Sequence, residues 1–106
     1  MKRKRRLVVF VPGSLRALRK LPAYVQRNVM GGIRTHLIEN DPREETNRKF
    51  RLHRASPCAD YELRIGSWRV FYRIEEETAD FTKLKITLIG EKRGNVLVVE
   101  GEEVRL

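Results

Sequence analysis

Residues 61–74 constrain the fold more strongly than any other part of the chain. Two runs with apolar or aromatic residues at alternate positions flank the dipeptide Gly66-Ser67 there. Glycine at the first central position of a two-residue loop suits a type II′ turn, whose twist matches that of a β-hairpin. This turn sets the register and predicts a hairpin with one apolar face, made of the cross-strand pairs Ile65–Trp68, Leu63–Val70 and Tyr61–Tyr72.

The opposite face of the predicted hairpin brings two like charges together. Its cross-strand pairs are Arg64–Arg69, Glu62–Phe71 and Asp60–Arg73. Two arginines directly opposite one another destabilise a sheet by up to about 1 kcal/mol, so their repulsion has to be offset. A bridge from Glu62 to Arg64 is one way, and a bound anion such as phosphate, whose geometry guanidinium groups match, is the other. We favour the anion, because Lys92 and Arg93 follow at the end of a later strand.

Further strands are expected on both sides of the hairpin. Residues 7–11, 84–89 and 96–99 are runs rich in apolar residues, and the polar stretch 43–57 has room for a short strand around Phe50 and Leu52. Residues 75–82 and Gly94-Asn95 are read as the turns between the later strands. Residues 96–99 form either an exposed edge, which invites pairing with another chain, or an ordinary paired strand.

Two helices are predicted between the first strand and the hairpin. Ser14 is a candidate N-cap for a short helix that Pro22 ends. The second helix has an apolar stripe at i, i+4 spacing, which is typical of a helix packed on a core and is made of Val25, Val29, Ile33 and Leu37. The pair Gly31-Gly32 weakens this helix by roughly 1 kcal/mol per glycine, which predicts a close approach of the sheet there.

These elements predict a single α+β domain spanning residues 1–106, since a chain of this length is about the size of one domain. The sheet is dominated by antiparallel strands, includes the N-terminal strand, and carries the two-helix hairpin on one face. Residues 1–6 contain five consecutive basic residues. We expect them to form a basic, flexible tail.

The charge distribution points to a polyanionic partner. The chain has 23 Lys and Arg against 14 Asp and Glu, a net charge of +9. Residues 1–54 hold 15 of the basic and 4 of the acidic residues, so the excess is one-sided. This pattern is typical of nucleic-acid binders, although a basic tail with solvated helix faces also produces it. We disfavour a membrane-surface protein, because no amphipathic helix rich in Trp or Phe accompanies the tail.

The rare residue types exclude several classes of protein. Cys58 is the single cysteine, so no internal disulfide can form, and a reducing compartment, the cytoplasm, is expected. Together with His36 and His53 it gives no pair at metal-ligand spacing, and we expect neither a metal nor another cofactor. The N-terminal apolar run, residues 7–11, is shorter than a signal-peptide core or a membrane span, so no membrane association is expected.

Residues 61–74 resemble a strand–turn–strand motif of the RelE/ParE superfamily of bacterial type II toxin–antitoxin toxins. Members carry a Tyr-x-Leu-Arg-like strand, a tight turn, and then an aromatic residue followed by Arg, two apolar residues and Tyr. The segments Ala-Leu-Arg-Lys-Leu-Pro at 17–22 and Ile-Gly-Glu-Lys-Arg at 89–93 resemble further parts of the family pattern. The resemblance covers most of residues 7–93, is nearer to the RelE branch, and implies a compact sheet with a helical hairpin on one face.

The resemblance also implies an enzyme that cleaves mRNA in the ribosomal A site without a metal. In this chemistry a ribose 2′-oxygen attacks the adjacent phosphate, and basic side chains stabilise the charge that develops. Arg69 matches the arginine after the aromatic residue, and we assign it to the scissile phosphate. Arg64 matches a basic position on the preceding strand, and Lys92 or Arg93 matches a late basic position. The candidates for binding RNA on the same surface are Arg51, His53, Arg54 and Arg73.

Two departures from the RelE pattern leave the activity open. Glu62 stands where RelE has a second basic residue, and no Tyr or His follows Arg93, whereas RelE uses a Tyr near its C-terminus and some relatives use a His. The expected function is a ribosome-dependent endoribonuclease toxin that acts on mRNA and blocks translation. The alternative is a ParE-like inhibitor of DNA gyrase, or a degenerate module that only binds RNA or its antitoxin. Either function implies an acidic antitoxin as partner, in a hetero-oligomer of toxin and antitoxin.

Overall fold

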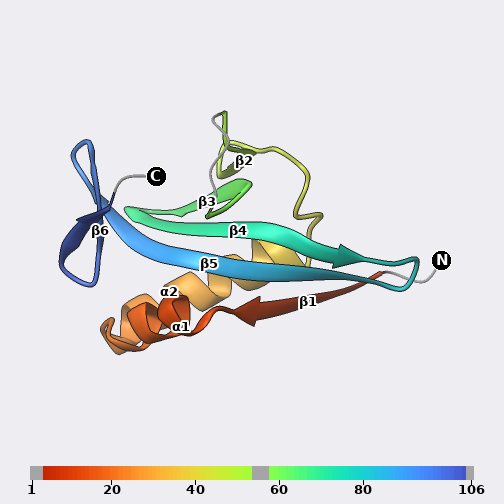
Figure 1. Cartoon of the computed structure of the whole chain (residues 1–106), viewed down its shortest axis with the longest axis horizontal. Helices are drawn as coiled ribbons and strands as arrows, with labels where there is room; N and C mark the ends of the chain where they lie inside the picture. Colours follow the sequence, from red (N-terminus) through yellow and green to blue (C-terminus); the bar gives the residue numbers. More distant parts are fainter. Residues whose placement is uncertain (1–3, 54–57, 105–106) are drawn as a thin grey trace.

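The structure, a computed structural model, describes residues 4–53 and 58–104. Seven strands form one sheet, in which β2, β3, β4, β5, β6 and β7 are neighbours in that order and β1 pairs with β5 in parallel. The helices lie on one face of this sheet, behind and below the strands in Figure 1. The fold is therefore the α+β arrangement that the sequence predicts. Its elements are β1 (Arg5–Phe10), α1 (Pro12–Arg19), α2 (Ala23–Ile33), the π-helical turn η1 (Arg34–Ile38), β2 (Lys49–Arg51), β3 (Tyr61–Ile65), β4 (Trp68–Glu77), β5 (Phe81–Arg93), β6 (Val96–Val99) and β7 (Glu102–Val104).

The predicted hairpin is confirmed as β3 and β4. Its register contains five of the six predicted cross-strand pairs, with Arg64 directly opposite Arg69. Gly66 has a φ of 59°, a left-handed conformation that glycine adopts without strain. On the apolar face Tyr61 and Tyr72 stack, with their ring centroids 5.2 Å apart. The turn residues and the alternation of apolar side chains thus act together to fix one register.

The helices cover the apolar face of the sheet. The predicted stripe of α2 and η1 is buried in the core, with Val29 and Leu37 fully inaccessible to solvent. A Cβ built on Gly32 would lie 2.4 Å from Cδ1 of Ile65, so the helix approaches β3 closely there. A Cβ on Gly31 would meet open space. The predicted packing reason therefore holds for Gly32 and is wrong for Gly31.

Two predictions for the N-terminal part of the chain are wrong in detail. β1 begins at Arg5, so Arg5 and Arg6 belong to a strand and not to a tail, since the ladder with β5 extends over both residues. Helix α1 begins two residues before Ser14, which is therefore not the N-cap. Ser14 is instead buried inside the first turn, where its hydroxyl donates to the carbonyl oxygens of Val11 and Ile86.

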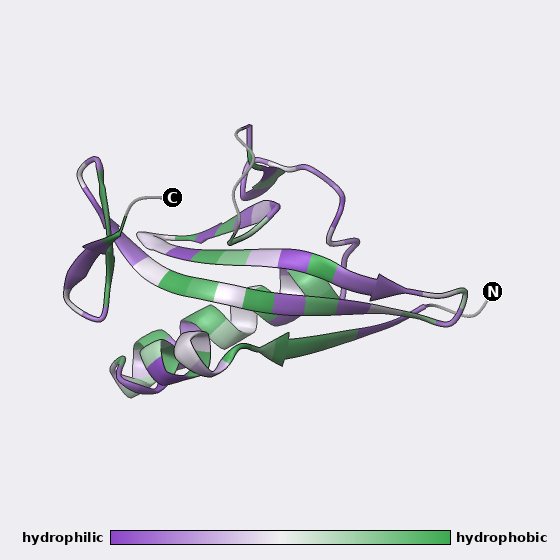
Figure 2. Cartoon of the chain, in the orientation of Figure 1, coloured by the Kyte–Doolittle hydropathy of each residue, from purple (hydrophilic) through white to green (hydrophobic). Residues whose placement is uncertain are grey.

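The later strands are longer than predicted, because polar residues can alternate along a strand that has one uncovered face. β4 continues to Glu77, and β5 runs from Phe81 to Arg93. Figure 2 shows apolar residues in the middle of β4 and β5 and polar residues toward the turn that joins them. β6 is confirmed at its predicted bounds, but β5 and β7 pair with it on both sides, so it is not an edge. β7 is short and mainly acidic and was not predicted.

β5 changes partners along its length, and this change shapes one end of the sheet. Its first half pairs with β1, whereas its last residues pair with β6. Gly90 lies next to this change, and a Cβ there would lie 2.8 Å from the carbonyl oxygen of Val98. The glycine therefore lets β6 cross close to β5. As a result the β6–β7 hairpin stands at the end of the sheet, beside the turn of the β3–β4 hairpin (Figure 1).

Candidate functional site

The sheet face opposite the helices, here called the open face, carries alternate residues of β3, β4 and β5. In β4 these residues are Arg69, Phe71 and Arg73, because successive side chains of a strand point to opposite faces and Val70 and Tyr72 lie in the core. A hollow of about 310 Å³, here called the Arg69 hollow, opens on this face. It is lined by Glu62, Arg69, Phe71, Lys92, Asn95, Leu97 and Val104.

The two arginines of the like-charged pair share one carboxylate. Oε2 of Glu62 lies 2.9 Å from Nε of Arg64 and 3.9 Å from Nε of Arg69. The Arg64 guanidinium also lies over the ring of Phe50, 4.7 Å from its centroid, which is a cation–π contact. The carboxylate bridge that the sequence offered as the alternative to a bound anion is therefore formed. The arginine pair does not require an anion to be stable.

Arg69 is held in a fixed position at the edge of the hollow, with 12% of its side chain exposed. Its Nη1 donates to the carbonyl oxygens of Gly66 at 2.7 Å and Trp68 at 3.0 Å. Burial lowers the pKa of the Arg69 guanidinium, the charge of Arg64 lowers it further, and Glu62 opposes both effects. Among the described residues, none accepts a hydrogen bond from its buried Nε. A cation ordered in this way can stabilise an anion at little further cost in side-chain entropy.

Lys92 and Arg93 lie on opposite sides of β5. The Lys92 side chain lines the Arg69 hollow, and its backbone N–H donates to the carbonyl oxygen of Ser67 at 2.8 Å, which ties the end of β5 to the hairpin turn. Arg93 forms an ion pair with Glu91, with Nε 2.7 Å from Oε1. Of the two candidates for the late basic position, the structure therefore brings Lys92, and not Arg93, to Arg69.

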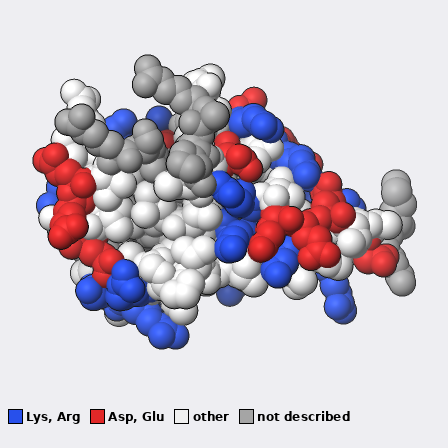
Figure 3. Space-filling view, viewed as in Figure 1, with Lys and Arg blue, Asp and Glu red and all other residues white. Residues whose placement is uncertain are grey.

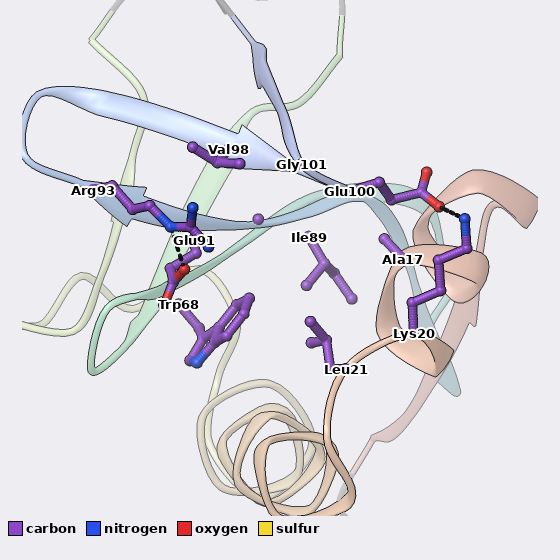
Figure 4. A pocket seen from close by; sticks show the side chains of 11 residues that line it. Ala17, Lys20, Leu21, Trp68, Ile89, Glu91, Arg93, Val98, Glu100 and Gly101 are labelled. Atoms are coloured by element: carbon purple, nitrogen blue, oxygen red, sulfur yellow. Dashed lines mark hydrogen bonds and ion pairs between the residues drawn. The ribbon is translucent and has the colours of Figure 1, made fainter.

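Arg93 belongs to a second hollow of about 330 Å³ on the helix side of the sheet (Figure 4). Its floor is apolar and includes Leu21, Trp68 and Ile89. Two ion pairs stand at its margins, Arg93–Glu91 on one side and Lys20–Glu100 on the other. The basic groups of this second hollow are thus already paired with carboxylates and lie apart from the Arg69 hollow.

Of the predicted RNA-binding residues, the structure brings Arg73 to the open face. Arg51 pairs with Tyr61 in the β2–β3 ladder, and its guanidinium lies 5.7 Å from the centroid of the Tyr61 ring, on the helix side. His53 is exposed beyond the end of β2. Arg54 lies outside the described residues. The sequence therefore grouped residues that follow one another along the chain, although the β2–β3 register separates Arg51 from the open face.

Sequence reasoning missed Lys85, which lies directly opposite Arg73 in the β4–β5 ladder. The pairing of Lys85 with Arg73 could not be counted from the sequence, because the register shifts between Phe71 and Tyr72, where β5 contains one extra residue. A β-bulge of this kind leaves no clear trace in the sequence. The contributions of β6 and β7 to the Arg69 hollow were missed because β7 was not predicted.

The chemistry available on the open face is that of cations and carboxylates. In residues 4–53 and 58–104, no cluster of three or more His, Cys, Asp or Glu is placed to hold a metal ion.

No helix of this part of the chain is both long and apolar enough to cross a membrane.

An N-terminal strand, two helices and an antiparallel meander with a basic open face define a RelE-like α+β fold. A chain in the crystal structure of the toxin–antitoxin complex RelBE2 from Mycobacterium tuberculosis shares this fold, with a TM-score of 0.63. The two chains are 23% identical, and the match covers 83% of this chain and 99% of that chain. No protein-family model and no curated protein sequence matches the chain. At this level of identity the likeness establishes the fold.

Proposed function

We propose that this chain is the toxin of a type II toxin–antitoxin pair and acts as a ribosome-dependent, metal-free mRNA endoribonuclease. The observation that carries the proposal is the Arg69 hollow. There the largely buried guanidinium of Arg69, which donates hydrogen bonds to two carbonyl oxygens, and the Lys92 ammonium flank one cavity on the open face of a RelE-like fold. Two cations at a cavity of this size suit a ligand that carries a phosphodiester, because charge-assisted hydrogen bonds to phosphate are strong.

The proposed reaction is attack of a ribose 2′-oxygen on the adjacent phosphorus. A bond forms between the 2′-oxygen and phosphorus, and the bond from phosphorus to the 5′-oxygen of the next nucleotide breaks, which leaves a cyclic phosphate and a free 5′-hydroxyl. Arg69 stabilises the negative charge that builds up on the non-bridging oxygens. Lys92 donates a proton to the leaving 5′-oxygen. The reaction requires RNA, since DNA lacks the 2′-hydroxyl.

The 2′-hydroxyl must lose a proton, and Glu62 is the group proposed to accept it. Glu62 is the one carboxylate among the described residues that line the hollow, and neither Tyr nor His is among them. No Tyr or His follows Arg93 in the sequence either. Glu62, which departs from the RelE pattern, therefore takes the place of the missing base in this proposal.

The decisive experiment is expression of the wild type and of Arg69→Ala in a bacterial host. The wild type is expected to arrest translation, and primer extension on cellular mRNA is expected to show cuts at a fixed position within codons. Arg69→Ala should abolish toxicity while far-UV circular dichroism remains unchanged. Arg27→Ala, which removes an exposed arginine of α2, is the matched control and should remain toxic. Full toxicity of Arg69→Ala would remove the basis of the proposal.

A second candidate function is a non-nuclease toxin, such as a ParE-like inhibitor of DNA gyrase, or a module that binds RNA or an antitoxin without catalysis. The carboxylate bridge favours it, because Glu62 neutralises the arginine pair that a phosphate would need. Intact mRNA together with a DNA-damage response after induction would favour gyrase inhibition. Intact mRNA without such a response would favour the binding module.

An acidic antitoxin that forms a hetero-oligomer with this chain in the cytoplasm is part of the proposal. The net charge of +9 favours an acidic partner, and the chain that shares this fold comes from a toxin–antitoxin complex. The test is to co-express a small acidic protein from the neighbouring reading frame. Such a protein should co-purify with this chain and relieve growth arrest, and a neighbour that does neither would contradict this part of the proposal.

A further inference from the structure

The β6–β7 hairpin turns at Glu100 and Gly101, and the backbone conformation there is unusual for a glutamate. Both residues have a positive φ, 50° at Glu100 and 85° at Gly101, as in a type I′ turn. Asn, Asp or Gly is preferred at the first of these positions, because the left-handed region is strained for longer side chains. Glu100 is the one non-glycine residue with a positive φ in the part of the chain that the structure describes. Strain that persists at one residue indicates a function for its side chain.

The Glu100 carboxylate connects this turn to helix α1. Its Oε1 lies 2.9 Å from Nζ of Lys20, the C-cap of the helix. Arg16 donates to both carboxylate oxygens, from Nε at 3.3 Å and from Nη2 at 3.4 Å. Arg16 and Lys20 are four residues apart, where like charges repel one another, and the carboxylate offsets this repulsion. Ion pairs near the surface contribute when an arginine binds in a bidentate way or several charges form a network, and both conditions are met here.

These ion pairs bridge one margin of the second hollow, which separates the hairpin from α1. Ala17 and Lys20 line the hollow from the helix, and Val98 and Gly101 line it from the hairpin (Figure 4). Figure 3 shows acidic side chains over the hairpin, at the left edge of the view, next to basic side chains over α1. In the described part of the chain, the ion pairs between the two elements are those of Glu100. Because the hollow leaves the apolar contact between hairpin and helix incomplete, the ion pairs determine how the hairpin sits on the helix.

The same hairpin forms one wall of the Arg69 hollow. Leu97 of β6 and Val104 of β7 lie opposite one another in their ladder, and both line this hollow. In the described sheet β7 pairs with β6 alone, and β6 pairs with β5 through its first three residues. Glu100 is three residues beyond Leu97, about 10 Å along a strand, so the contact with α1 and the wall lie at opposite ends of the hairpin. A hairpin released at Glu100 can rotate about β5, which moves Val104 relative to Arg69.

We propose that Glu100 is a positioning residue, which fixes the β6–β7 hairpin on α1 and thereby fixes the Leu97–Val104 wall of the Arg69 hollow. The proposal rests on the proposed function, because the wall bounds the cavity that receives the phosphodiester. Held in place, the wall keeps the ligand against Arg69 and limits the access of water, which strengthens the attraction between their charges. The competing roles of Glu100 are a contribution to fold stability alone or to net charge alone, and the experiment separates the three.

The central variant is Glu100→Asn. It removes the carboxylate and shortens the side chain, so both ion pairs are lost, but asparagine is favoured before Gly101 in a type I′ turn. Glu103→Gln removes an exposed carboxylate of the same hairpin and is the matched control for charge.

A second variant, Arg16→Gln/Lys20→Gln, breaks the same ion pairs from the helix and leaves the hairpin unchanged. Both side chains are largely exposed, so the substitutions disturb no core packing. Arg19→Gln/Arg27→Gln removes two charges from other exposed helix positions and is its matched control. If Glu100 acts through α1, combining Arg16→Gln/Lys20→Gln with Glu100→Asn should add little to the effect of either.

The single tryptophan of the chain reports on the hairpin without any need for activity. Trp68 lies on the floor of the second hollow. Acrylamide quenching of its fluorescence should increase in Glu100→Asn and in Arg16→Gln/Lys20→Gln, because the released hairpin uncovers the hollow, and should stay at the wild-type value in both controls. Unchanged quenching in both variants would overturn the proposal.

Binding and cleavage of RNA report on the wall. A short single-stranded RNA with 2′-O-methyl riboses cannot be cleaved by 2′-oxygen attack, and fluorescence anisotropy measures its affinity. Loss of a carboxylate by itself favours a polyanion, so Glu103→Gln should bind this RNA at least as tightly as the wild type, whereas Glu100→Asn should bind it more weakly. Single-turnover cleavage on ribosomes at saturating protein should be slower in Glu100→Asn by up to about 10²-fold, the cost of a displacement of about 1 Å. The urea midpoint of Glu100→Asn should equal or exceed that of the wild type, since the turn is no longer strained.

Two further results would contradict the positioning role. RNA binding by Glu100→Asn as tight as that by Glu103→Gln would mean that Glu100 acts through its charge alone. A lower urea midpoint of Glu100→Asn together with wild-type cleavage would mean that Glu100 only stabilises the fold.

The outcome is separable from that of the proposed function. If quenching and RNA affinity change as expected while the wild type leaves mRNA intact on ribosomes, the positioning role stands and the endoribonuclease proposal fails. If the wild type cuts mRNA and Glu100→Asn cuts it at the same rate, the endoribonuclease proposal stands and the positioning role is refuted.

Discussion

The Glu62 carboxylate has two competing effects in the Arg69 hollow, because it both neutralises Arg64 and Arg69 and offers a proton acceptor. Glu62→Gln keeps the shape of the side chain and removes its charge. We expect this variant to bind uncleavable RNA more tightly than the wild type and to cleave mRNA slower by about 10²–10⁴-fold, the usual contribution of a general base. Fluorescence anisotropy and single-turnover cleavage on ribosomes measure the two effects.

Glu39→Gln, which removes an exposed carboxylate next to η1, is the control for the charge change. Weaker RNA binding by Glu62→Gln would contradict the first expectation and would mean that the bridge is needed to orient the two arginines. Unchanged cleavage would contradict the second and would remove Glu62 from the chemistry.

Gly31 and Gly32 are adjacent in α2 but differ in their surroundings. A Cβ at position 31 meets open space, so Gly31→Ala should stabilise the fold by about 0.5–1 kcal/mol through helix propensity. A Cβ at position 32 lies 2.4 Å from Cδ1 and 2.7 Å from Cγ1 of Ile65, and overpacking of this kind usually costs about 1–3 kcal/mol. Urea unfolding should rank Gly31→Ala above the wild type and Gly32→Ala below it. Equal stability of the two variants would show that Ile65 moves aside freely.

At this scale the sequence predicts what a tight turn dictates and misses what long-range packing decides. The β3–β4 register, and with it the positions of Arg64 and Arg69, follows from Gly66-Ser67 together with the alternation of apolar side chains on both sides of it. Lys49 could not be predicted in this way. It is fully buried, its ammonium donates to the carbonyl oxygens of His36 and Asp41, and burial lowers its pKa. The polar stretch 43–57 gives no indication that its single lysine is buried against the core.

Glu77 joins four segments at the far end of β4. Hydrogen bonds from Arg43, then from Thr82 and Lys4, lower the pKa of the Glu77 carboxyl to about 2. Since this pKa lies below its ordinary value of about 4.5, the carboxylate stabilises the fold above pH 4.5 and the contribution is lost as the pH falls toward 2. We expect Glu77→Gln to melt below the wild type at pH 7 and level with it near pH 2.

Thermal unfolding followed by circular dichroism between these pH values measures the difference. Glu76→Gln, which removes the neighbouring exposed carboxylate, is the matched control and should show a smaller difference at pH 7. If the gap between the wild type and Glu77→Gln persists to pH 2, a lost ion pair is not its cause.

Elements were predictable where their pattern is local. The apolar stripe predicted α2, and a run of β-branched residues predicted β6 at its observed bounds. β7 was not predictable, because Glu102–Val104 is a strand only through its pairing with β6. The hollow shares this dependence, since Val104 lines it and Gly90 allows β6 to approach β5. The basic half of the candidate site could therefore be read from the sequence, whereas the wall formed by the C-terminal hairpin could not.

At the scale of the whole molecule, the parallel pair β1–β5 closes the longest loop of the fold, since it joins the first strand to residues near position 85. Loop closure over this distance costs more conformational entropy than closure of the β3–β4 hairpin, so we expect the hairpin to form before β1 docks. The order of these two steps is tested by comparing the folding and unfolding rates of Val70→Ala, in the hairpin, with those of Val8→Ala, in β1. Each substitution removes two methyl carbons, a loss of up to about 1.6 kcal/mol at about 0.8 kcal/mol per buried group, and the loss is smaller for the partly buried Val8.

If β1 docks last, Val8→Ala should leave the folding rate near that of the wild type and speed unfolding, whereas Val70→Ala should slow folding. Stopped-flow chevron plots in urea give both rates. The comparison is matched, because both side chains are valines that pack in the same core, one fully buried and one partly buried. Equal slowing of folding by both variants would mean that β1 is already paired in the transition state. The sheet would then assemble around β5 from both sides at once.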